Sequence, residues 1–358
     1  MQQLLDRRAA AVLADDEDAF LATVAPGRPA FLAQQRQVFD NLRLLPVADL
    51  SFRLDGARIL RSLTLDGFDG QPEVGPAGFG AERRGHRLLV VPPSPAERGT
   101  DPWDLTAIEV RAGPRVLAVS DRASRSRVDD VMSAVSHGIP DVERAVPGDW
   151  GDTVVVYVFA DPAVLTSYAQ VPGGNLRHLG GISFPVRGGP HGRRVVGSRL
   201  ALLPGAMDVE TGELARIVRH ELTHVAVGAR ANGVPLWLSE GIAEYVAALP
   251  VPASKQRIAT VAVRDARHGG VELPDAATFN DADQDLHYSV AWMACSYLAD
   301  KHGASVLWQL LDAMRNAHVG RTGVGQDAVL RAVVGLDSTQ LADHASARIR
   351  KQFAKPGS

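Results

Sequence analysis

The chain has 358 residues, of which 46% are hydrophobic and 22% charged, a composition typical of globular proteins. Its formal net charge of −3 gives no reason to expect a nucleic acid or an anionic membrane surface as a partner. The single cysteine, Cys295, cannot form a disulfide within the chain and lies in an apolar run. A small buried residue is therefore favoured over a nucleophile at this position.

The length makes two domains the expectation, and the pattern changes near Ser120. Residues 1–119 predict a small α+β domain in which helices come first and strands follow. Helices are predicted at the N-terminus and at 31–45, and strands at 50–54, 59–65, 87–91, 107–111 and 115–119. This order resembles the cone-like fold of the nuclear transport factor two and SnoaL-like group. No polar residues converge in the pattern, so a structural or partner-binding role is favoured over a ligand site.

Residues 120–358 predict a second domain in which strands precede helices. A polar helix at 127–145 is followed by strands at 153–159, 182–186 and 194–203. The next helix is expected to begin after Thr211 as its N-cap and to end at Gly228. After a turn the pattern is almost wholly helical as far as Lys351.

The segment His220-Glu221-Leu222-Thr223-His224 carries the strongest chemical information in the chain. Residues four apart share one face of a helix, so His220 and His224 can aim both imidazoles at one point, with Glu221 beside it. Two imidazoles, an open coordination position and a carboxylate suit a catalytic zinc ion and the proton of its bound water. So short a motif also arises by chance or persists in an inactive site, and a third ligand is needed to support the interpretation.

A glutamate in the next predicted helix can supply that ligand. Glu240 follows His224 by 16 residues, and Glu244 lies one turn further on the same helical face, where it can hold a ligand from behind. The surrounding residues, among them Trp237 and Ile242, are too apolar for carboxylates without a function. Gly241 is costly inside a helix, and we expect a close approach of the histidine-bearing helix to explain it.

The two segments together, His220-Glu221-x-x-His224 and Trp237-Leu238-Ser239-Glu240-Gly241-x-Ala243-Glu244-Tyr245, resemble the gluzincin zinc metallopeptidases, most closely their peptidase MA-like branch. The aminopeptidase N family is a more distant relative, and the glutamate of its W-L-x-E-G-F-A segment is the third zinc ligand. The resemblance covers roughly residues 120–303. It implies one zinc ion held by His220, His224 and Glu240, with Glu221 as general base and acid.

A tyrosine further along the chain extends the resemblance. Gluzincins carry a tyrosine that opens a helix of this kind and stabilises the oxyanion formed during hydrolysis, and Tyr288 matches that position. Such a donor can supply a few kcal/mol of transition-state stabilisation. The alternative for Tyr288 is a core or helix-capping residue. His287 is a second candidate for the donor, and Tyr297 is expected to pack.

Departures from the family pattern leave the substrate open. The spacing between His224 and Glu240 is shorter than in the aminopeptidases. Their amine-binding G-x-M-E-N segment has only a chance counterpart in Gly205-Ala206-Met207-Asp208. The stretch 199–203 is the expected edge strand along which an extended substrate pairs. Endopeptidase, dipeptide-trimming and aminopeptidase activities are therefore all compatible with the sequence.

The sequence thus predicts an α+β protein with a cone-like domain at 1–119 and a zinc metallopeptidase domain at 120–358, acting on a peptide or protein. One alternative is a zinc-containing binding or scaffold protein without turnover. Another places the main function in a ligand-binding N-terminal module, which a deep pocket with converging polar groups would support. No signal peptide is evident and the apolar run 154–160 is too short to span a bilayer. The resemblance nevertheless favours an extracytoplasmic location, since peptidase MA-like proteins are often exported or membrane-tethered.

Overall fold

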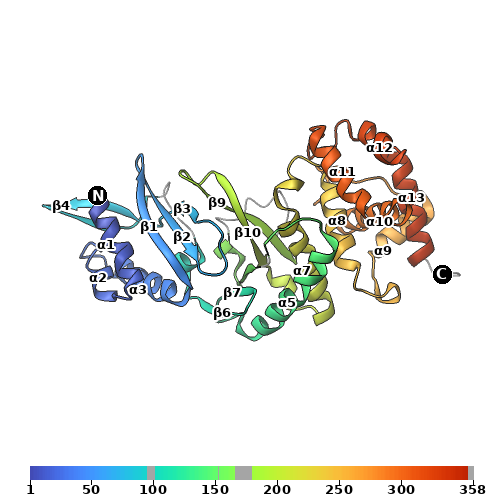
Figure 1. Ribbon diagram of the computed structural model, residues 1–358. Helices are drawn as coiled ribbons and strands as arrows, with labels where there is room; N and C mark the ends of the chain where they lie inside the picture. The colour runs from blue at the N-terminus through green and yellow to red at the C-terminus, as the bar shows by residue number, and fades with distance from the viewer. Residues whose placement is uncertain (95–100, 152, 166–179, 354–358) are drawn as a thin grey trace. The chain divides into compact units, whose positions relative to one another are not determined.

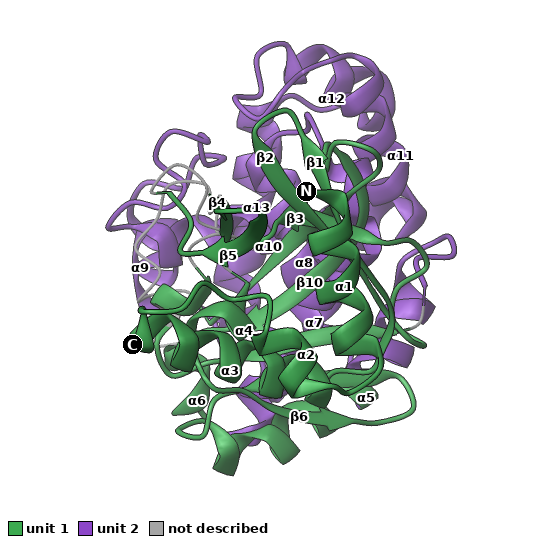
Figure 2. Ribbon diagram, turned by 90° about the vertical axis from the view of Figure 1, so that its left-hand side faces the viewer, with its two compact units in different colours: residues 1–136, 152–172, 176–209 green, residues 137–151, 173–175, 210–358 purple. Residues whose placement is uncertain are grey.

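The computed structural model describes residues 1–94, 101–151, 153–165 and 180–353 (Figure 1). The chain divides into two compact units, coloured separately in Figure 2: unit 1 comprises residues 1–136, 152–172 and 176–209, and unit 2 comprises 137–151, 173–175 and 210–358. The α+β fold class is confirmed, with a sheet in unit 1 and helices in unit 2. The expected domain boundary at 119/120 lies inside unit 1, because strands from both sides of it join one sheet.

Unit 1 contains several short or medium helices in its described residues, and their apolar faces cover part of its core. They are α1 (Gln2–Leu13), α2 (Glu17–Leu21), α3 (Pro29–Leu44), the short α4 (Pro102–Leu105) and, much later in the chain, α6 (Pro204–Met207). Asp16 caps α2 by accepting a hydrogen bond from the Ala19 backbone at 2.8 Å. Pro29 lies in the first turn of α3, where its missing N–H costs nothing.

The described residues of unit 1 form an eight-stranded sheet in the order β1-β2-β3-β9-β10-β8-β7-β6, and a separate two-stranded ribbon of β4 (Gly80–Arg84) and β5 (Arg87–Val91). The strands of the large sheet are β1 (Val47–Asp55), β2 (Arg58–Leu65), β3 (Glu73–Pro76), β6 (Glu109–Ala112), β7 (Val116–Ser120), β8 (Val154–Val158), β9 (Gly181–Gly188) and β10 (Arg194–Leu202). β8 pairs in parallel with β7 and β10, and the other pairs are antiparallel. All five residues of β8 are buried, as expected of a parallel strand covered on both faces.

The prediction of an edge strand at 199–203 is wrong. Residues 200–202 of β10 pair with β9 on one side and with β8 on the other, so this stretch has no free edge for a substrate. β8 lies some 40 residues earlier in the chain, and a local pattern cannot report such a pairing. Two further strands escaped prediction, β3 and β4 (Gly80–Arg84), which pairs with β5 (Arg87–Val91). Both are short and contain glycine, which weakens the alternation that identifies a strand.

Unit 2 is helical, as the sequence predicted for the region after residue 236. Its helices are α7 (Thr211–Val227), α8 (Leu236–Ala248), α9 (Thr260–His268), α10 (Gln284–His302), α11 (Ser305–Asn316), α12 (Gln326–Val334) and α13 (Ser338–Phe353). α5 (Val128–Ala145) begins in unit 1 and ends in unit 2. α10 is the central helix, buried along its middle and in contact with α8, α9, α11 and α13.

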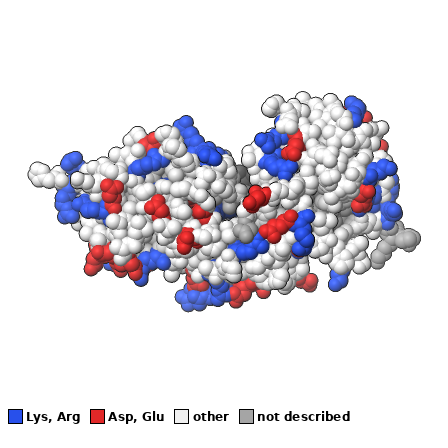
Figure 3. Space-filling model, viewed as in Figure 1, with Lys and Arg blue, Asp and Glu red and all other residues white. Residues whose placement is uncertain are grey.

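The ends of α7 differ slightly from the prediction. Thr211 is the first helical residue rather than the N-cap, which is Glu210. Gly228 ends the helix as predicted, with a φ of 50° that glycine adopts without strain. No helix in the described residues is long and apolar enough to cross a bilayer. On the face shown in Figure 3, acidic and basic side chains are scattered over both units.

Candidate metal centre

Three donor atoms from α7 and α8 converge in unit 2. His220 and His224 lie one turn apart on α7, with their Nε2 atoms 3.1 Å from each other. Glu240 of α8 places its Oε2 3.3 Å from Nε2 of His220 and 3.2 Å from Nε2 of His224. In the described part of the chain, this is the only group of three or more such side chains close enough to share a metal ion.

The donor geometry fits a zinc ion. Tetrahedral coordination with bonds of about 2.0–2.1 Å places neighbouring donor atoms about 3.3–3.4 Å apart. The three observed separations, 3.1–3.3 Å, agree with this arrangement. The side chains are 9–19% exposed, so they are shielded from solvent without being sealed. Two imidazoles and one carboxylate leave a fourth coordination position open, the donor set of a catalytic rather than a structural zinc site.

Packing of α7 fixes the direction of the two histidines. Leu214, Val218 and Leu222 are fully buried on its apolar side, which sets the rotation of the helix about its axis. The helical period then holds His220 and His224 on a shared face. The convergence of the two imidazoles is therefore a local consequence of the sequence once the apolar side is buried.

The reason for glycine at position 241 differs from the one predicted. A Cβ atom at this position would lie 2.4 Å from the carbonyl oxygen of Ala291 and 2.7 Å from Sγ of Cys295. Both belong to α10, so α10 and not the histidine-bearing helix makes the close approach. The physical reason is rotational: successive helical residues are about 100° apart, so Gly241 faces away from the side that carries Glu240. Cys295 is buried at this contact, in line with the prediction of a small core residue.

Glu244 lies behind His220 and links it to an arginine. Its Oε1 is 3.0 Å from Nδ1 of His220, and its Oε2 accepts a hydrogen bond from Nη1 of Arg216 at 2.7 Å. Burial raises the pKa of the Glu244 carboxyl, but Arg216 and His220 outweigh burial and hold it at about 2. Sequence reasoning missed Arg216. The only signals were its position one turn before His220 and its i,i+3 spacing from Glu213.

The other titratable groups of the centre have pKa values shifted in opposite directions. Burial raises the pKa of Glu221, and the nearby His220 and His224 offset it only in part. Burial lowers the pKa of His220, but the nearby carboxylates of Glu240 and Glu244 outweigh burial and raise it to about 10. Burial also acts against ionisation of Glu240, yet the two histidines hold its pKa far below the usual range. The carboxylates of Glu221, Glu240 and Glu244 thus make the centre attractive to cations, and a metal ion can bind there in place of protons.

Tyr288, in the first turns of α10, lies beside the metal cluster. Its ring centroid is 6.0 Å from that of His220, and Phe279 packs edge-on against its ring at 4.9 Å. Burial and the three surrounding carboxylates raise its pKa well above the usual value, so the hydroxyl keeps its proton. Nδ1 of His287, the second candidate, is 3.1 Å from the carbonyl oxygen of Phe279.

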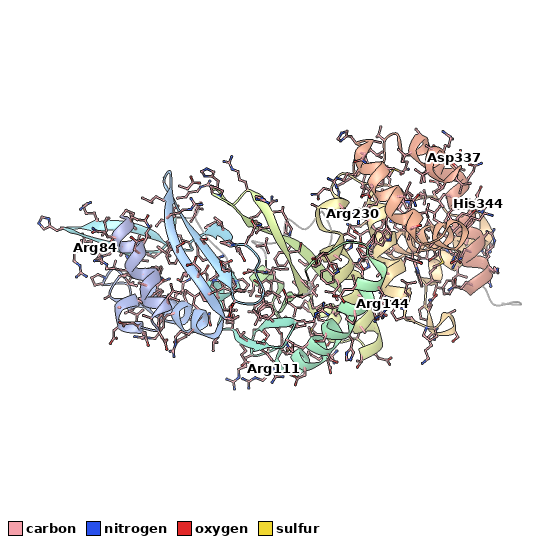
Figure 4. All side chains as sticks on the ribbon, in the orientation of Figure 1. Arg84, Arg111, Arg144, Arg230, Asp337 and His344 are labelled. Atoms are coloured by element: carbon pink, nitrogen blue, oxygen red, sulfur yellow. The ribbon has the colours of Figure 1, made fainter. Side chains whose placement is uncertain are left out.

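Tyr297 has the packing role expected of it. Its ring stacks on the ring of His344 at 4.2 Å, on the side of unit 2 where Figure 4 labels His344. It thereby joins α10 to α13.

Unit 1 contains polar groups that converge on a small cavity. Aromatic side chains line this cavity together with Arg8, Gln35, Arg61 and Asp104. Its volume of about 10 Å³ has room for roughly one water molecule. Polar groups do converge at this cavity, but its volume is too small for the ligand of a binding module.

Residues 205–351 match the sequence model of a family described as the Peptidase MA superfamily. The matched stretch contains every side chain of the metal cluster and confirms the predicted resemblance over those residues. A comparison with curated proteins found no match.

Among solved structures, the chain is similar to an M1 zinc metallopeptidase from Deinococcus radiodurans. A mutant form of that enzyme is 12% identical with a TM-score of 0.34, and 85% of this chain covers 61% of the enzyme. The mutant bound to a Tyr-Ser-Ala substrate is 13% identical with a TM-score of 0.35, covering 87% of this chain and 61% of that chain. The present chain thus spans less than two thirds of the length of these solved structures.

Proposed function

We propose that this chain is a zinc-dependent metallopeptidase whose catalytic centre lies in unit 2. The observation that carries the proposal is the convergence of His220, His224 and Glu240 at separations of 3.1–3.3 Å, beside a buried carboxyl group and a tyrosine hydroxyl. The Peptidase MA superfamily match over residues 205–351 supports the same reaction class. A bound zinc ion would polarise the scissile carbonyl group and lower the pKa of a water molecule to near neutrality.

Glu221 is the proposed proton carrier. In peptide hydrolysis a water molecule must lose a proton as it attacks the carbonyl carbon, and the leaving amine must gain one as the C–N bond breaks. A carboxylate next to the metal ligands on α7 can accept the first proton and deliver it to the amine. Burial raises the pKa of Glu221, which brings its proton affinity closer to the working pH and suits both transfers.

Tyr288 is the proposed oxyanion donor. As the carbonyl carbon becomes tetrahedral, negative charge develops on its oxygen, and a neutral O–H group in a shielded site stabilises that charge. The carboxylates of Glu221, Glu240 and Glu244 disfavour a phenolate at Tyr288, so its hydroxyl stays available as a donor. Phe279 packs edge-on against the ring, which holds the donor in place before substrate arrives.

The proposal is tested by metal content and by one conservative substitution. Purified protein should contain close to one equivalent of zinc. In an assay with a mixed library of fluorogenic peptides, it should hydrolyse some of the peptides. Glu221→Gln should keep the zinc and lose about 10²–10⁴-fold in hydrolysis. Glu272→Gln, at an exposed position of the same unit, is the matched control and should change neither property.

Two outcomes would overturn the proposal. One is a native protein that neither contains zinc nor takes it up on titration. The other is full peptide hydrolysis by the Glu221→Gln variant. A protein that binds zinc but hydrolyses no peptide in the library would instead favour the binding or scaffold role.

A further inference from the structure

An arginine next to the metal cluster is held by two glutamates. Arg216 of α7 contacts Glu213 through Nε at 3.0 and 3.1 Å from the two carboxylate oxygens, and through Nη2 at 2.7 Å. Its remaining arm, Nη1, donates to Oε2 of Glu244 on α8 at 2.7 Å. The other oxygen of Glu244 is 3.0 Å from Nδ1 of His220. The contacts form a continuous series from Glu213 through Arg216 and Glu244 to His220.

This series restricts the orientation of every group in it. A guanidinium is planar and its donors form a rigid fork, so engagement of Nε and Nη2 by Glu213 fixes the direction of Nη1. Glu244 then has one oxygen engaged by Arg216 and the other facing His220, so its carboxylate cannot rotate without losing a contact. A carboxylate at Nδ1 selects the imidazole tautomer with a proton on that nitrogen. Nε2 of His220 faces His224 and Glu240, and it is the nitrogen that would donate its lone pair to a bound metal ion.

Charge gives the same series a second role. Glu221, Glu240 and Glu244 bring three carboxyl groups into one largely buried region. Arg216 is the cation in direct contact with one of them, and its side chain is 32% exposed. Its charge therefore faces the carboxylate of Glu244 at 2.7 Å, while part of the side chain remains in contact with water.

We infer that Arg216 is a positioning residue that acts through Glu244 on His220, and that it raises the affinity of the centre for zinc. The inference rests on the proposed function. A simpler role would be a tie between α7 and α8 that stabilises the fold alone. The two roles differ in one respect: a mere tie would leave the zinc affinity of the folded protein unchanged.

The experiment is a double-mutant cycle on zinc affinity. The zinc dissociation constant would be measured by competition with a chromophoric chelator for the unmodified chain, Arg216→Gln, Glu244→Gln and the double variant. Loss of a group that orients a metal ligand commonly costs 10–100-fold in affinity. We expect a loss in this range for Glu244→Gln and about 3–10-fold for Arg216→Gln, which acts one contact further away. The double variant should be no weaker than Glu244→Gln alone, because both residues act through one path.

Two further readouts separate positioning from stability. The visible absorption spectrum of the cobalt(II)-substituted protein reports ligand geometry, and it should change in Arg216→Gln. Thermal unfolding of the metal-free proteins identifies any variant that has lost its fold. Arg216→Lys, which keeps the charge but not the fork, should fall between the unmodified chain and Arg216→Gln in zinc affinity.

Arg331→Gln is the matched control. Arg331 of α12 also lies between two carboxylates, at 3.0 Å from Asp337 and 3.9 Å from Asp327, and its side chain is 59% exposed. Figure 4 labels Asp337 at the α12 end of unit 2, well apart from α7. This substitution should leave the zinc affinity and the cobalt spectrum unchanged.

The outcomes distinguish this inference from the proposed function. If the unmodified chain binds no zinc, both are overturned. If it binds zinc but folded Arg216→Gln and Arg216→Lys bind equally well, only the role of Arg216 is overturned. Fully additive losses in the double variant would also contradict it, because they would show that Arg216 does not act through Glu244.

Discussion

Two clusters of buried charged or ionisable side chains in this protein differ in what they can do. In unit 1, Arg61 contacts Glu73 and Asp101, and Arg199 contacts Glu73 and Asp69, with both guanidinium side chains only 4% exposed. In unit 2, the centre is built from His220, His224 and Glu240 and is 9–19% exposed. Burial and charge alone therefore do not separate the two clusters.

The two clusters differ in whether acceptor atoms with free lone pairs point toward a common centre. An arginine has five donors and no acceptor, so the contacts of the unit 1 cluster close between guanidinium and carboxylate groups and leave no set of converging acceptors. Its residues lie on β2, β3 and β10, in the loop between β2 and β3, and at the N-cap of α4, so they tie the sheet to its neighbouring elements. In unit 2, three acceptor atoms face one point. The comparison teaches that converging acceptors, rather than buried charge, mark a metal centre.

The largest effect is expected where a buried ion pair is broken in unit 1. Arg61→Leu removes the guanidinium contacts of Arg61 with Glu73 and Asp101, and loss of one partner of a buried ion pair costs about 3–5 kcal/mol in the free energy of unfolding. Urea unfolding checks this value, and zinc affinity should not change. Arg36→Leu removes a 54% exposed pair with Glu17 and should cost less than about 1 kcal/mol. Equal costs at the two sites would remove the distinction between buried and exposed pairs.

In unit 2 the corresponding test affects the rate and leaves the fold intact. Tyr288→Phe removes the proposed oxyanion donor and should lower kcat by about 10²–10³-fold, with zinc content and thermal stability little changed. Steady-state kinetics on a peptide substrate provide the measurement. Tyr297→Phe, at the ring stacked on His344, is the control and should keep its activity. An unchanged kcat in Tyr288→Phe would assign this tyrosine to packing.

A third test connects packing to the metal centre. In Gly241→Ala the new methyl group meets Ala291 and Cys295 of α10, and such overpacking costs about 1–3 kcal/mol. The strain should also displace the neighbouring Glu240 and weaken zinc binding. Gly212→Ala in α7, where nothing lies within 4 Å of the added atom, should be neutral or stabilising by up to about 1 kcal/mol. If Gly241→Ala and Gly212→Ala change stability and zinc binding equally, the close approach of α10 is not the reason for glycine at position 241.

The smallest expected effect is a pH dependence of the stability of unit 1 that arises from Asp104. Burial raises the pKa of Asp104 to about 6, against the opposing pull of Arg61 and Arg8. A carboxyl group whose pKa is higher in the folded than in the unfolded chain destabilises the fold when ionised. The cost is present above pH 6 and disappears as the pH falls from about 6 to about 4.

Asp104→Asn should therefore be more stable than the unmodified chain at pH 7–8, by at most about 3 kcal/mol. The gap should close at about pH 4, as measured by thermal unfolding across this range. Asp40→Asn, at an exposed position of α3, is the control and should show no such closing gap. A difference that stays constant with pH would show that charge burial at Asp104 is not its cause.

The sequence by itself determined the local chemistry. His220, Glu221 and His224 belong to one helix, and the helical period alone places the two imidazoles on one face. Glu240 was a candidate because of its position in the next predicted helix, and Tyr288 because of the motif resemblance; the structure places both residues close to His220. The helices after residue 236 were predictable because each buries a periodic apolar face.

Only the tertiary structure decided which distant elements meet. Glu213 and Arg216 have the spacing of an ordinary surface ion pair, and only the packing of α8 on α7 brings Glu244 to Arg216. The close approach at Gly241 comes from α10, some 50 residues later in the chain. β10 lies inside the sheet because β8 pairs with it. Periodicity reports which face of an element is buried but carries no record of its partner, and partners are set by packing between residues far apart in the chain.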